Sequence, residues 1–254
     1  MDKLKRCFFT GGWDSTYMVL KYLKEGYDVQ PIYAIDIDRK SYSKEIETMN
    51  KIISIIKSTT DYSDNLYNLV CIDLSTVKSI QEKNNAYEII KSKIYIGTQY
   101  VWLSEIAQEY GCISVGIEKP SGEYSGCVEA INQFGGLKKI DGEFVIDKEK
   151  SSKVLIELMG DFVFPIIDIT ENEMINDIKK WEFEYIMKEI WFCHTPIKEQ
   201  PCGLCRPCQQ KMECNMEFLL PEVARKRFYK SQRIKKIFGE KISNCYKMII
   251  RKFL

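Results

Sequence analysis

The chain of 254 residues contains a single histidine, His194, which leaves few candidates for the general base of a hydrolytic triad. Because His194 directly follows Cys193, we expect it to pack beside that cysteine rather than to act in catalysis. Apolar runs of about 18 residues, the length of a membrane helix, are absent. Lys3, Lys5 and Arg6 lead straight into a short strand, without the apolar segment of a secretion signal. We therefore expect a soluble, cytoplasmic protein that does not contact membranes.

The chain also lacks a large net charge, but its value of +1 hides an uneven distribution. Residues 221–254 hold eleven Lys and Arg residues against Glu222 and Glu240, a net charge of +9, so the other 220 residues carry −8. Cationic and apolar residues alternate there at helical spacing, which predicts an amphipathic basic helix. Such a helix could bind nucleic acid, pack on the rest of the protein or contact an acidic protein partner.

The length and a hydrophobic content of 45% fit one α/β domain with an appendage. Apolar segments of strand length occur at 6–10, 29–35, 69–74, 112–117 and 163–167. Apolar residues at helical spacing separate these segments, so strands and helices alternate. Continuous apolar strands of this kind predict a parallel sheet with helices on both faces. Residues 135–153 interrupt the pattern around Asp141-Gly142, and we expect a hairpin or a loop there.

The first expected strand ends in the segment Thr10-Gly11-Gly12-Trp13-Asp14-Ser15-Thr16. Two glycines let backbone N–H groups approach an anion closely, and Asp14, Ser15 and Thr16 are candidates to cap the helix that follows. The segment lacks the ending of a Walker A loop and the third glycine of a dinucleotide-binding loop. We therefore expect a different phosphate-binding turn, and the alternative is a capped Gly-Gly turn without a ligand.

Ten cysteines could indicate the disulfide framework of a small secreted domain, but the chain is too long for that class. Cys193, Cys202, Cys205 and Cys208 have the spacing C-x8-C-x2-C-x2-C. Four thiolates at this spacing predict a closed tetrahedral zinc site, and an iron–sulfur cluster is the alternative. Four other cysteines lie in or beside apolar segments and are expected to be small buried residues: Cys7, Cys71, Cys112 and Cys127.

The two motifs together resemble a known family. The glycine loop resembles the Ser-Gly-Gly-x-Asp-Ser loop of the ATP-pyrophosphatase superfamily, with Thr10 in place of the first serine. With four cysteines near residue 200, the chain resembles the 7-cyano-7-deazaguanine synthase family from Cys7 to Met212. This resemblance implies an adenine nucleotide alpha-hydrolase-like fold with an ATP-pyrophosphatase-like α/β domain (1–190) and a four-cysteine metal knuckle (191–220). The basic helical tail (221–254), which the resemblance does not cover, forms the third part.

The resemblance also implies a chemistry. In this family a substrate carboxylate attacks the α-phosphate of ATP, pyrophosphate leaves, and ammonia takes the acyl group before dehydration gives a nitrile. The implied cofactors are ATP, Mg²⁺ and Zn²⁺, and the implied substrate is 7-carboxy-7-deazaguanine or a related carboxylate. Asp14 and Ser15 would be catalytic, and the ATP phosphates would be bound by Thr10, Gly11, Gly12, Asp14, Ser15 and Thr16.

Further candidates lie at the expected carboxyl ends of strands, where ligands of parallel sheets bind. Asp36 and Arg39 follow the second strand and are expected to contact the adenosine. Glu118 ends a later strand and, together with Tyr124, is a weaker candidate for contact with the substrate. For each of these residues, a solvated position in a loop is the alternative.

The chain departs from the family at three places. Residues 97–99 read Gly-Thr-Gln where the family has an Arg-Asn pair, and residues 124–128 lack an aspartate and an arginine of the family's substrate segment. Glu171 stands where the family has a lysine, and three lysines are candidates to compensate: Lys119, Lys138 and Lys139. An intact phosphate loop beside an altered substrate segment indicates adenylation with a different acceptor.

Three functions follow from these observations. The first is an ATP-dependent ligase or synthase that passes the acyl group to ammonia or an amine. An enzyme of this kind would resemble synthase-like relatives in anti-phage operons. One group of these relatives is thought to join a deazaguanine carboxylate to a protein amine. The second is a tRNA-modifying adenylating enzyme that holds RNA with its basic tail, and the third is a non-catalytic nucleotide-binding homologue. We expect a protein or tRNA acceptor as partner, and a homodimer.

Overall fold

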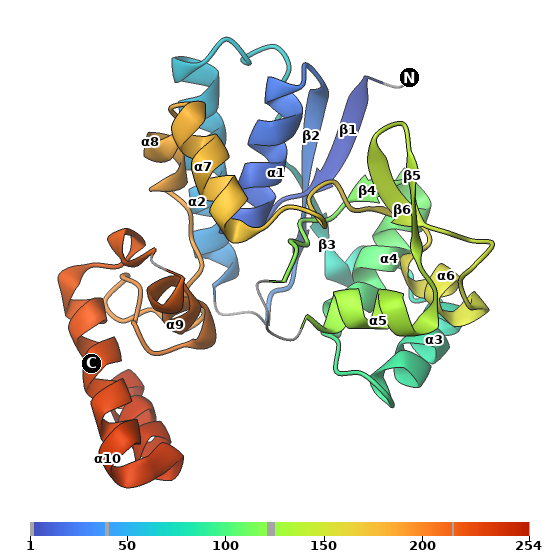
Figure 1. The fold of residues 1–254 in the computed structure, drawn as a ribbon. Helices are drawn as coiled ribbons and strands as arrows, with labels where there is room; N and C mark the ends of the chain where they lie inside the picture. Colours follow the sequence, from blue (N-terminus) through green and yellow to red (C-terminus); the bar gives the residue numbers. More distant parts are fainter. Residues whose placement is uncertain (1–2, 39–40, 121–124, 215, 254) are drawn as a thin grey trace.

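The computed structural model describes residues 3–38, 41–120, 125–214 and 216–253 (Figure 1). Seven strands form one sheet in the order β3-β2-β1-β4-β7-β6-β5. The strands are β1 (Leu4–Phe8), β2 (Asp28–Ile35), β3 (Val70–Asp73), β4 (Ile113–Ser114), β5 (Leu137–Ile140), β6 (Glu143–Ile146) and β7 (Phe162–Val163). In the described part of the chain, no helix is long and apolar enough to span a bilayer.

The expected α/β architecture is confirmed, with one correction to the sheet. The five apolar segments predicted from the sequence are β1, β2, β3, β4 and β7, and all of them pair in parallel. Residues 135–153 form the expected hairpin, in which β5 and β6 pair antiparallel. Because β6 also pairs antiparallel with β7, the sheet is mixed rather than wholly parallel.

Helices cover both faces of the sheet, and the alternation of side chains along β1 shows why. Cys7 packs into one core with helices α1 (Trp13–Lys24), α2 (Tyr42–Thr59), α7 (Glu171–Lys180) and α8 (Glu184–Met187). Phe8 points the other way, into a second core with α3 (Gln81–Lys91), α4 (Gln99–Tyr110), α5 (Gly126–Phe134) and α6 (Lys153–Met159). Strands with apolar residues on both faces need this double cover.

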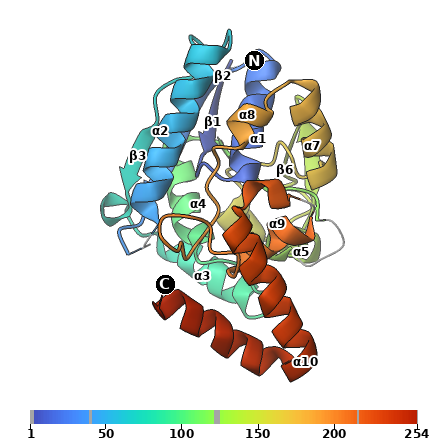
Figure 2. The same ribbon diagram turned by 90° about the vertical axis from the view of Figure 1, so that its left-hand side faces the viewer.

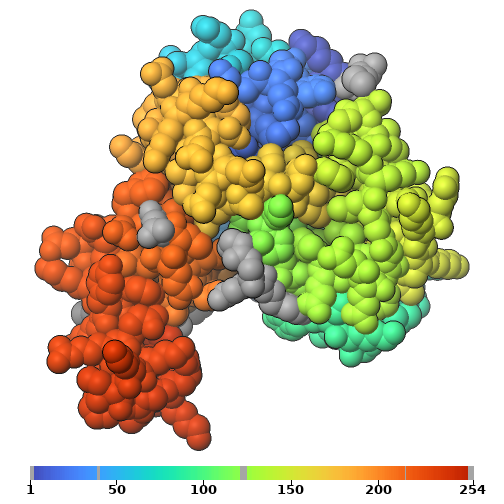
Figure 3. All heavy atoms as spheres, in the orientation of Figure 1, coloured from blue at the N-terminus to red at the C-terminus, as the bar shows by residue number. Residues whose placement is uncertain are grey.

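The chain from Trp191 onward forms a third apolar cluster beside the sheet. Its members come from the cysteine segment with α9 (Arg206–Glu213) and from the start of α10 (Glu222–Phe253), where Ala224 and Phe228 are buried. The basic tail therefore packs on the knuckle, and the boundary between these two parts stays a prediction. At Gly239 the backbone has φ of 82°, so α10 turns and the Ser243 hydroxyl donates a hydrogen bond to the Ser231 carbonyl at 3.0 Å. The resulting helical hairpin protrudes from the body (Figures 2 and 3).

Two of the four cysteines expected in the core are not there. Cys7 and Cys127 are buried, but Cys71 and Cys112 are exposed. Cys71 lies on β3, which is the edge strand of the sheet, and Cys112 lies in the turn after α4. An apolar neighbourhood in the sequence therefore does not guarantee burial at a sheet edge or in a turn.

Candidate functional site

The glycine loop joins β1 to α1 at the carboxyl end of the sheet. Gly11 has φ of +67°, a conformation that glycine adopts without strain, and a Cβ at this position would lie 3.1 Å from Met49 Cγ. The Trp191 N–H donates to the Gly11 carbonyl at 2.9 Å, and the hydroxyls of Thr10 and Ser15 lie 3.1 Å apart. The loop is therefore held from both sides, by α2 and by the segment that leads into the cysteines.

The start of α1 differs from the sequence expectation. Asp14, Ser15 and Thr16 were expected to cap this helix, but the helix begins at Trp13 with Gly12 as its N-cap, and no side chain accepts a capping hydrogen bond. Asp14, Ser15 and Thr16 follow this N-cap and lie inside the helix, so none of them is the N-cap residue. The first backbone N–H groups of α1 thus keep their donor capacity, and the positive end of the helix dipole is open to an anion.

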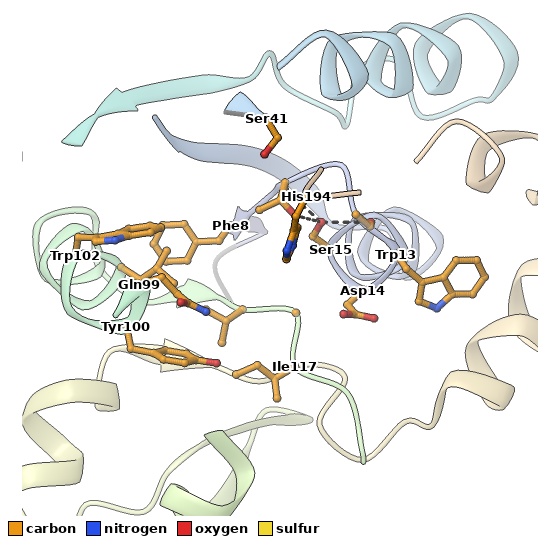
Figure 4. A pocket seen from close by; sticks show the side chains of 15 residues that line it. Phe8, Trp13, Asp14, Ser15, Ser41, Gln99, Tyr100, Trp102, Ile117 and His194 are labelled. Carbon is orange, nitrogen blue, oxygen red and sulfur yellow. Dashed lines mark hydrogen bonds between the residues drawn. The ribbon is translucent and has the colours of Figure 1, made fainter. Parts of the chain in front are cut away.

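A cavity of about 630 Å³ opens in front of this helix end (Figure 4). Thr10, Gly12, Asp14 and Ser15 line one side, together with the side chain of His194. An aromatic and amide wall lines the other side: Phe8, Gln99, Tyr100 and Trp102. The volume is that of a small-molecule site, with polar loop groups opposite flat side chains. Such a shape suits a ligand with an anionic end and a planar end.

Two carboxyl groups face this region from different elements. Asp14 lines the cavity of 630 Å³, and both Asp14 and Glu118 line a neighbouring cavity of about 500 Å³. Burial raises the pKa of Asp14 to about 6, and burial together with the charges of Asp14 and Glu171 raises the pKa of Glu118 to about 8. Among the described residues, the buried Glu118 Oε2 has no hydrogen-bond partner. The site therefore brings carboxyl groups together without enough cationic charge to keep their pKa values at ordinary levels.

These raised pKa values predict how stability changes with pH when no magnesium is added. The folded Glu118 carboxyl keeps its proton until about pH 8, whereas in the unfolded chain it ionises near its ordinary pKa of 4.5. The free energy of unfolding should therefore fall as pH rises from 4.5 to about 8. In Glu118→Gln this fall should be smaller, as measured by urea unfolding at several pH values. Equal pH dependence in both proteins would show that Glu118 titrates normally.

The cation beside Glu171 is not one of the expected three. Lys211, on α9, places its Nζ 2.6 Å from Glu171 Oε1, and both side chains are buried. Lys119 is exposed, while Lys138 and Lys139 lie on the β5 strand of the hairpin. Among the described ion pairs, Glu171 is therefore joined to Lys211 and to none of the three candidates. The physical reason is that α9 folds back over the start of α7 and buries Lys211 there.

The four cysteines of the knuckle lie together as predicted from their spacing. Their sulfur atoms lie within 4.8 Å of one another, and all four residues are buried. The Sγ pairs of Cys202 with Cys208 and of Cys193 with Cys205 are each 3.9 Å apart, near the roughly 3.8 Å of sulfurs around tetrahedral zinc. The N–H groups of Leu204 and Cys205 both point at Cys202 Sγ from 3.2 Å. The arrangement could hold one zinc ion.

Gly203 fixes the turn between two of these cysteines, which gives a test of the knuckle. It has φ of +74°, and a Cβ there would lie 2.0 Å from the Ala224 carbonyl oxygen on α10. Gly203→Ala should therefore lower the melting temperature and the metal content, because both the turn and the start of α10 that packs against it must shift. Gly142→Ala has a similar positive φ of +90° but nothing within 4 Å of the added Cβ, so it serves as the matched control. Equal effects in both variants would contradict this account.

The other predicted residues are distributed as follows. Thr16 is fully buried, and its Oγ1 has no hydrogen-bond partner among the described residues. Asp36 follows β2, and its Oδ1 accepts a hydrogen bond from the Asp38 N–H at 3.1 Å. Neither residue belongs to the described lining of the cavities around the loop. Arg39 and Tyr124 lie outside the described residues. Their functional roles, like those of the loop residues, stay predictions.

Several residues of the site were not expected from the sequence. His194, expected to pack beside Cys193, is exposed and lines the cavity of 630 Å³. Gln99 and Tyr100 line the same cavity, although the altered segment 97–99 had indicated only the loss of a cation. Burial holds the pKa of the Tyr100 phenol well above its ordinary value, so it is a neutral hydrogen-bonding group. The apolar pattern of α4 gives no sign of this role.

Comparison with known proteins identifies distant relatives. Two 7-cyano-7-deazaguanine synthases, from Campylobacter jejuni subsp. doylei and Campylobacter jejuni subsp. jejuni serotype O:6, are each 23% identical over 226 residues. The match spans 82% of this chain and 91% of each relative. This similarity confirms the resemblance found in the motifs, with the chain as a divergent relative. No protein-family model matches the chain.

A search of solved structures gives a weaker match. A predicted subunit of tRNA methyltransferase from Methanocaldococcus jannaschii aligns with 16% identity and a TM-score of 0.36. The alignment covers 69% of this chain and 74% of that one.

Proposed function

From the similarity to 7-cyano-7-deazaguanine synthases over most of the chain, we propose that this protein adenylates a carboxylate with ATP and releases pyrophosphate. The activated acyl group then passes to a nitrogen nucleophile. The observation that carries this proposal is the uncapped start of α1, which faces a cavity of about 630 Å³ beside Asp14. An anion of the size of pyrophosphate fits this helix end by charge and by hydrogen bonding.

The loop would act on the leaving group. As the bond between the α-phosphorus and the bridging oxygen breaks, negative charge grows on the pyrophosphate. The first N–H groups of α1 are held in place by the helix before the reaction, so they can donate to that charge without rearranging. The hydroxyls of Thr10 and Ser15, which lie 3.1 Å apart, can turn their hydrogens to the same charge. The open end of the helix dipole adds to the same stabilisation.

The carboxyl groups of Asp14 and Glu118 fit a magnesium ion. Their oxygens are the ligand type that Mg²⁺ prefers, and the buried Glu118 Oε2 lacks a hydrogen-bond partner among the described residues. Bound magnesium would neutralise phosphate charge at this site. Before any ion binds, burial and mutual repulsion favour the protonated carboxyl groups, so magnesium binding should release protons near pH 7.

The proposed reaction has two steps. A carboxylate oxygen of the substrate attacks the α-phosphorus of ATP, and pyrophosphate leaves with the electron pair of the broken bond. A nitrogen nucleophile then attacks the acyl carbon, AMP leaves with the carboxylate oxygen, and the nitrogen loses a proton. The wall formed by Tyr100 and Trp102 suits a planar substrate such as 7-carboxy-7-deazaguanine.

A second candidate is a tRNA-modifying adenylating enzyme. It is favoured by α10, where Lys and Arg side chains such as Lys226, Lys230 and Arg233 are exposed on a protruding hairpin. Several exposed cations near a phosphate backbone give affinity for RNA that falls with salt. This candidate differs from the first in its acceptor, and it uses the same phosphate loop.

Pyrophosphate release separates the candidates. The protein is incubated with ATP and Mg²⁺, and with 7-carboxy-7-deazaguanine, with total tRNA or with neither. We expect release with the deazaguanine carboxylate and an amine or ammonia. Release with tRNA alone would support the second candidate, and no release under any condition would support a non-catalytic nucleotide-binding homologue.

A further inference from the structure

Lys211 occupies an unusual position for a lysine. Its Nζ lies 2.6 Å from Glu171 Oε1 and 5.2 Å from the centre of the Trp13 ring, and the residue is 6% exposed. It lines a cavity of about 220 Å³ together with Thr10, Gly12 and Asp14. Of the lysines and arginines that the structure describes, Lys211 is the one that shares a cavity lining with Thr10 and Gly12.

The charges around Lys211 do not balance. Asp14, Glu118 and Glu171 all interact with this one ammonium, which opposes the rise in the pKa values of Asp14 and Glu118. An isolated ion pair of Lys211 with Glu171 would be a weak source of stability, because burying two charges costs about as much as their attraction returns. A role in binding an anionic ligand explains a buried cation beside the glycine loop better than a role in stability does.

The knuckle determines where Lys211 stands. Helix α9 starts directly after Cys205, its N-cap residue, and carries Cys208 in its first turn. Lys211 follows Cys208 by three residues, so the two side chains lie on neighbouring parts of the same helix surface. Cys208 is fully buried among the other three cysteines. The cluster thus anchors the helix that holds the ammonium over the loop.

We propose that Lys211 binds the β- and γ-phosphate oxygens of the nucleotide, and that the four-cysteine knuckle positions it for this. The inference rests on the proposed function, since it assigns a further residue to the same ATP site. An ammonium has three N–H donors, and Glu171 takes one of them. The other two N–H groups can donate hydrogen bonds to phosphate oxygens. This binding involves no proton transfer. Glu171 orients the side chain before ATP binds.

The test measures binding by calorimetry with three probes: ATP, inorganic pyrophosphate and adenosine. Lys211→Met should weaken the binding of ATP and pyrophosphate roughly tenfold or more, the loss expected for a charged hydrogen bond, and leave adenosine unchanged. Glu171→Gln keeps the ammonium and should retain pyrophosphate binding. Lys91→Met, which removes the partner of Glu88 at 3.6 Å on the exposed face of α3, is the matched control.

A double variant keeps the test valid if Lys211→Met folds poorly. Glu171→Met with Lys211→Met removes both members of the buried ion pair together, so its melting temperature should fall less than that of Lys211→Met. It should still lose pyrophosphate binding. Pyrophosphate binding within twofold of the wild type in this folded variant would overturn the proposed role of Lys211. It would leave the proposed function of the protein untouched. Absence of ATP and pyrophosphate binding in the wild type would overturn the proposed function, and this inference with it.

Discussion

A Cys205→Ser variant is expected to lose its metal and a large part of its folding stability together. The sulfur of Cys205 is one of four that lie within 4.8 Å of one another, and a serine hydroxyl is a poor substitute for a thiolate ligand. Metal binding contributes on the order of 10 kcal/mol to folding in small zinc modules. The cysteines form one apolar cluster with Trp191 and Phe228. Loss of the metal should therefore also weaken the packing of α10 against the cysteine segment.

This prediction is checked by metal analysis and thermal unfolding of the same samples. Cys245→Ser is the matched control, because Cys245 is exposed on α10 and lies outside the cluster. The control should keep the metal content and melting temperature of the wild type. If Cys205→Ser kept both as well, the knuckle would not be a structural metal site. Metal analysis of the wild type also decides between zinc and an iron–sulfur cluster.

An Asp14→Asn variant is expected to lose adenylation while keeping its fold. Asparagine has the shape of aspartate without its charge, so it cannot help to neutralise magnesium at the phosphates. We expect pyrophosphate release to fall about 100-fold or more, as when one preorganised electrostatic group is lost from an active site. Burial already favours the neutral form of Asp14, with a pKa of about 6, so removing the charge should not lower the melting temperature.

Steady-state pyrophosphate release and thermal unfolding test this pair of expectations. Asp64→Asn, at an exposed position after α2, is the matched control and should behave as the wild type in both measurements. Full activity in Asp14→Asn would remove Asp14 from the mechanism. A large fall in melting temperature would mean instead that Asp14 is a structural residue.

The sheet could be predicted from the sequence because its signals are local. Five strands are continuous apolar runs, and each run is followed by helical spacing, so the parallel core follows from elementary periodicity. The β5–β6 hairpin has an Asp141-Gly142 turn that marks it. The bend of α10 was missed, although Gly239 lies in the middle of the helical pattern and is the residue type that permits it.

The candidate site could be predicted only in part. The loop and the cysteines are short motifs, so their residues are visible in a few positions of the sequence. The pairing of Lys211 with Glu171 joins residues 40 positions apart on two helices, and no local pattern encodes it. Likewise, the cap of α1 depends on a small offset: the N-cap is Gly12, two residues before Asp14, so the predicted capping residues fall inside the helix.

The most direct measurement is the fate of a labelled oxygen. The substrate, 7-carboxy-7-deazaguanine with ¹⁸O in its carboxylate, is incubated with the protein, ATP, Mg²⁺ and ammonia, and the nucleotide product is analysed by mass spectrometry. We expect AMP that carries one ¹⁸O from the carboxylate, together with unlabelled pyrophosphate. Unlabelled AMP, or ADP with inorganic phosphate, would show that no acyl-adenylate forms and would contradict the account.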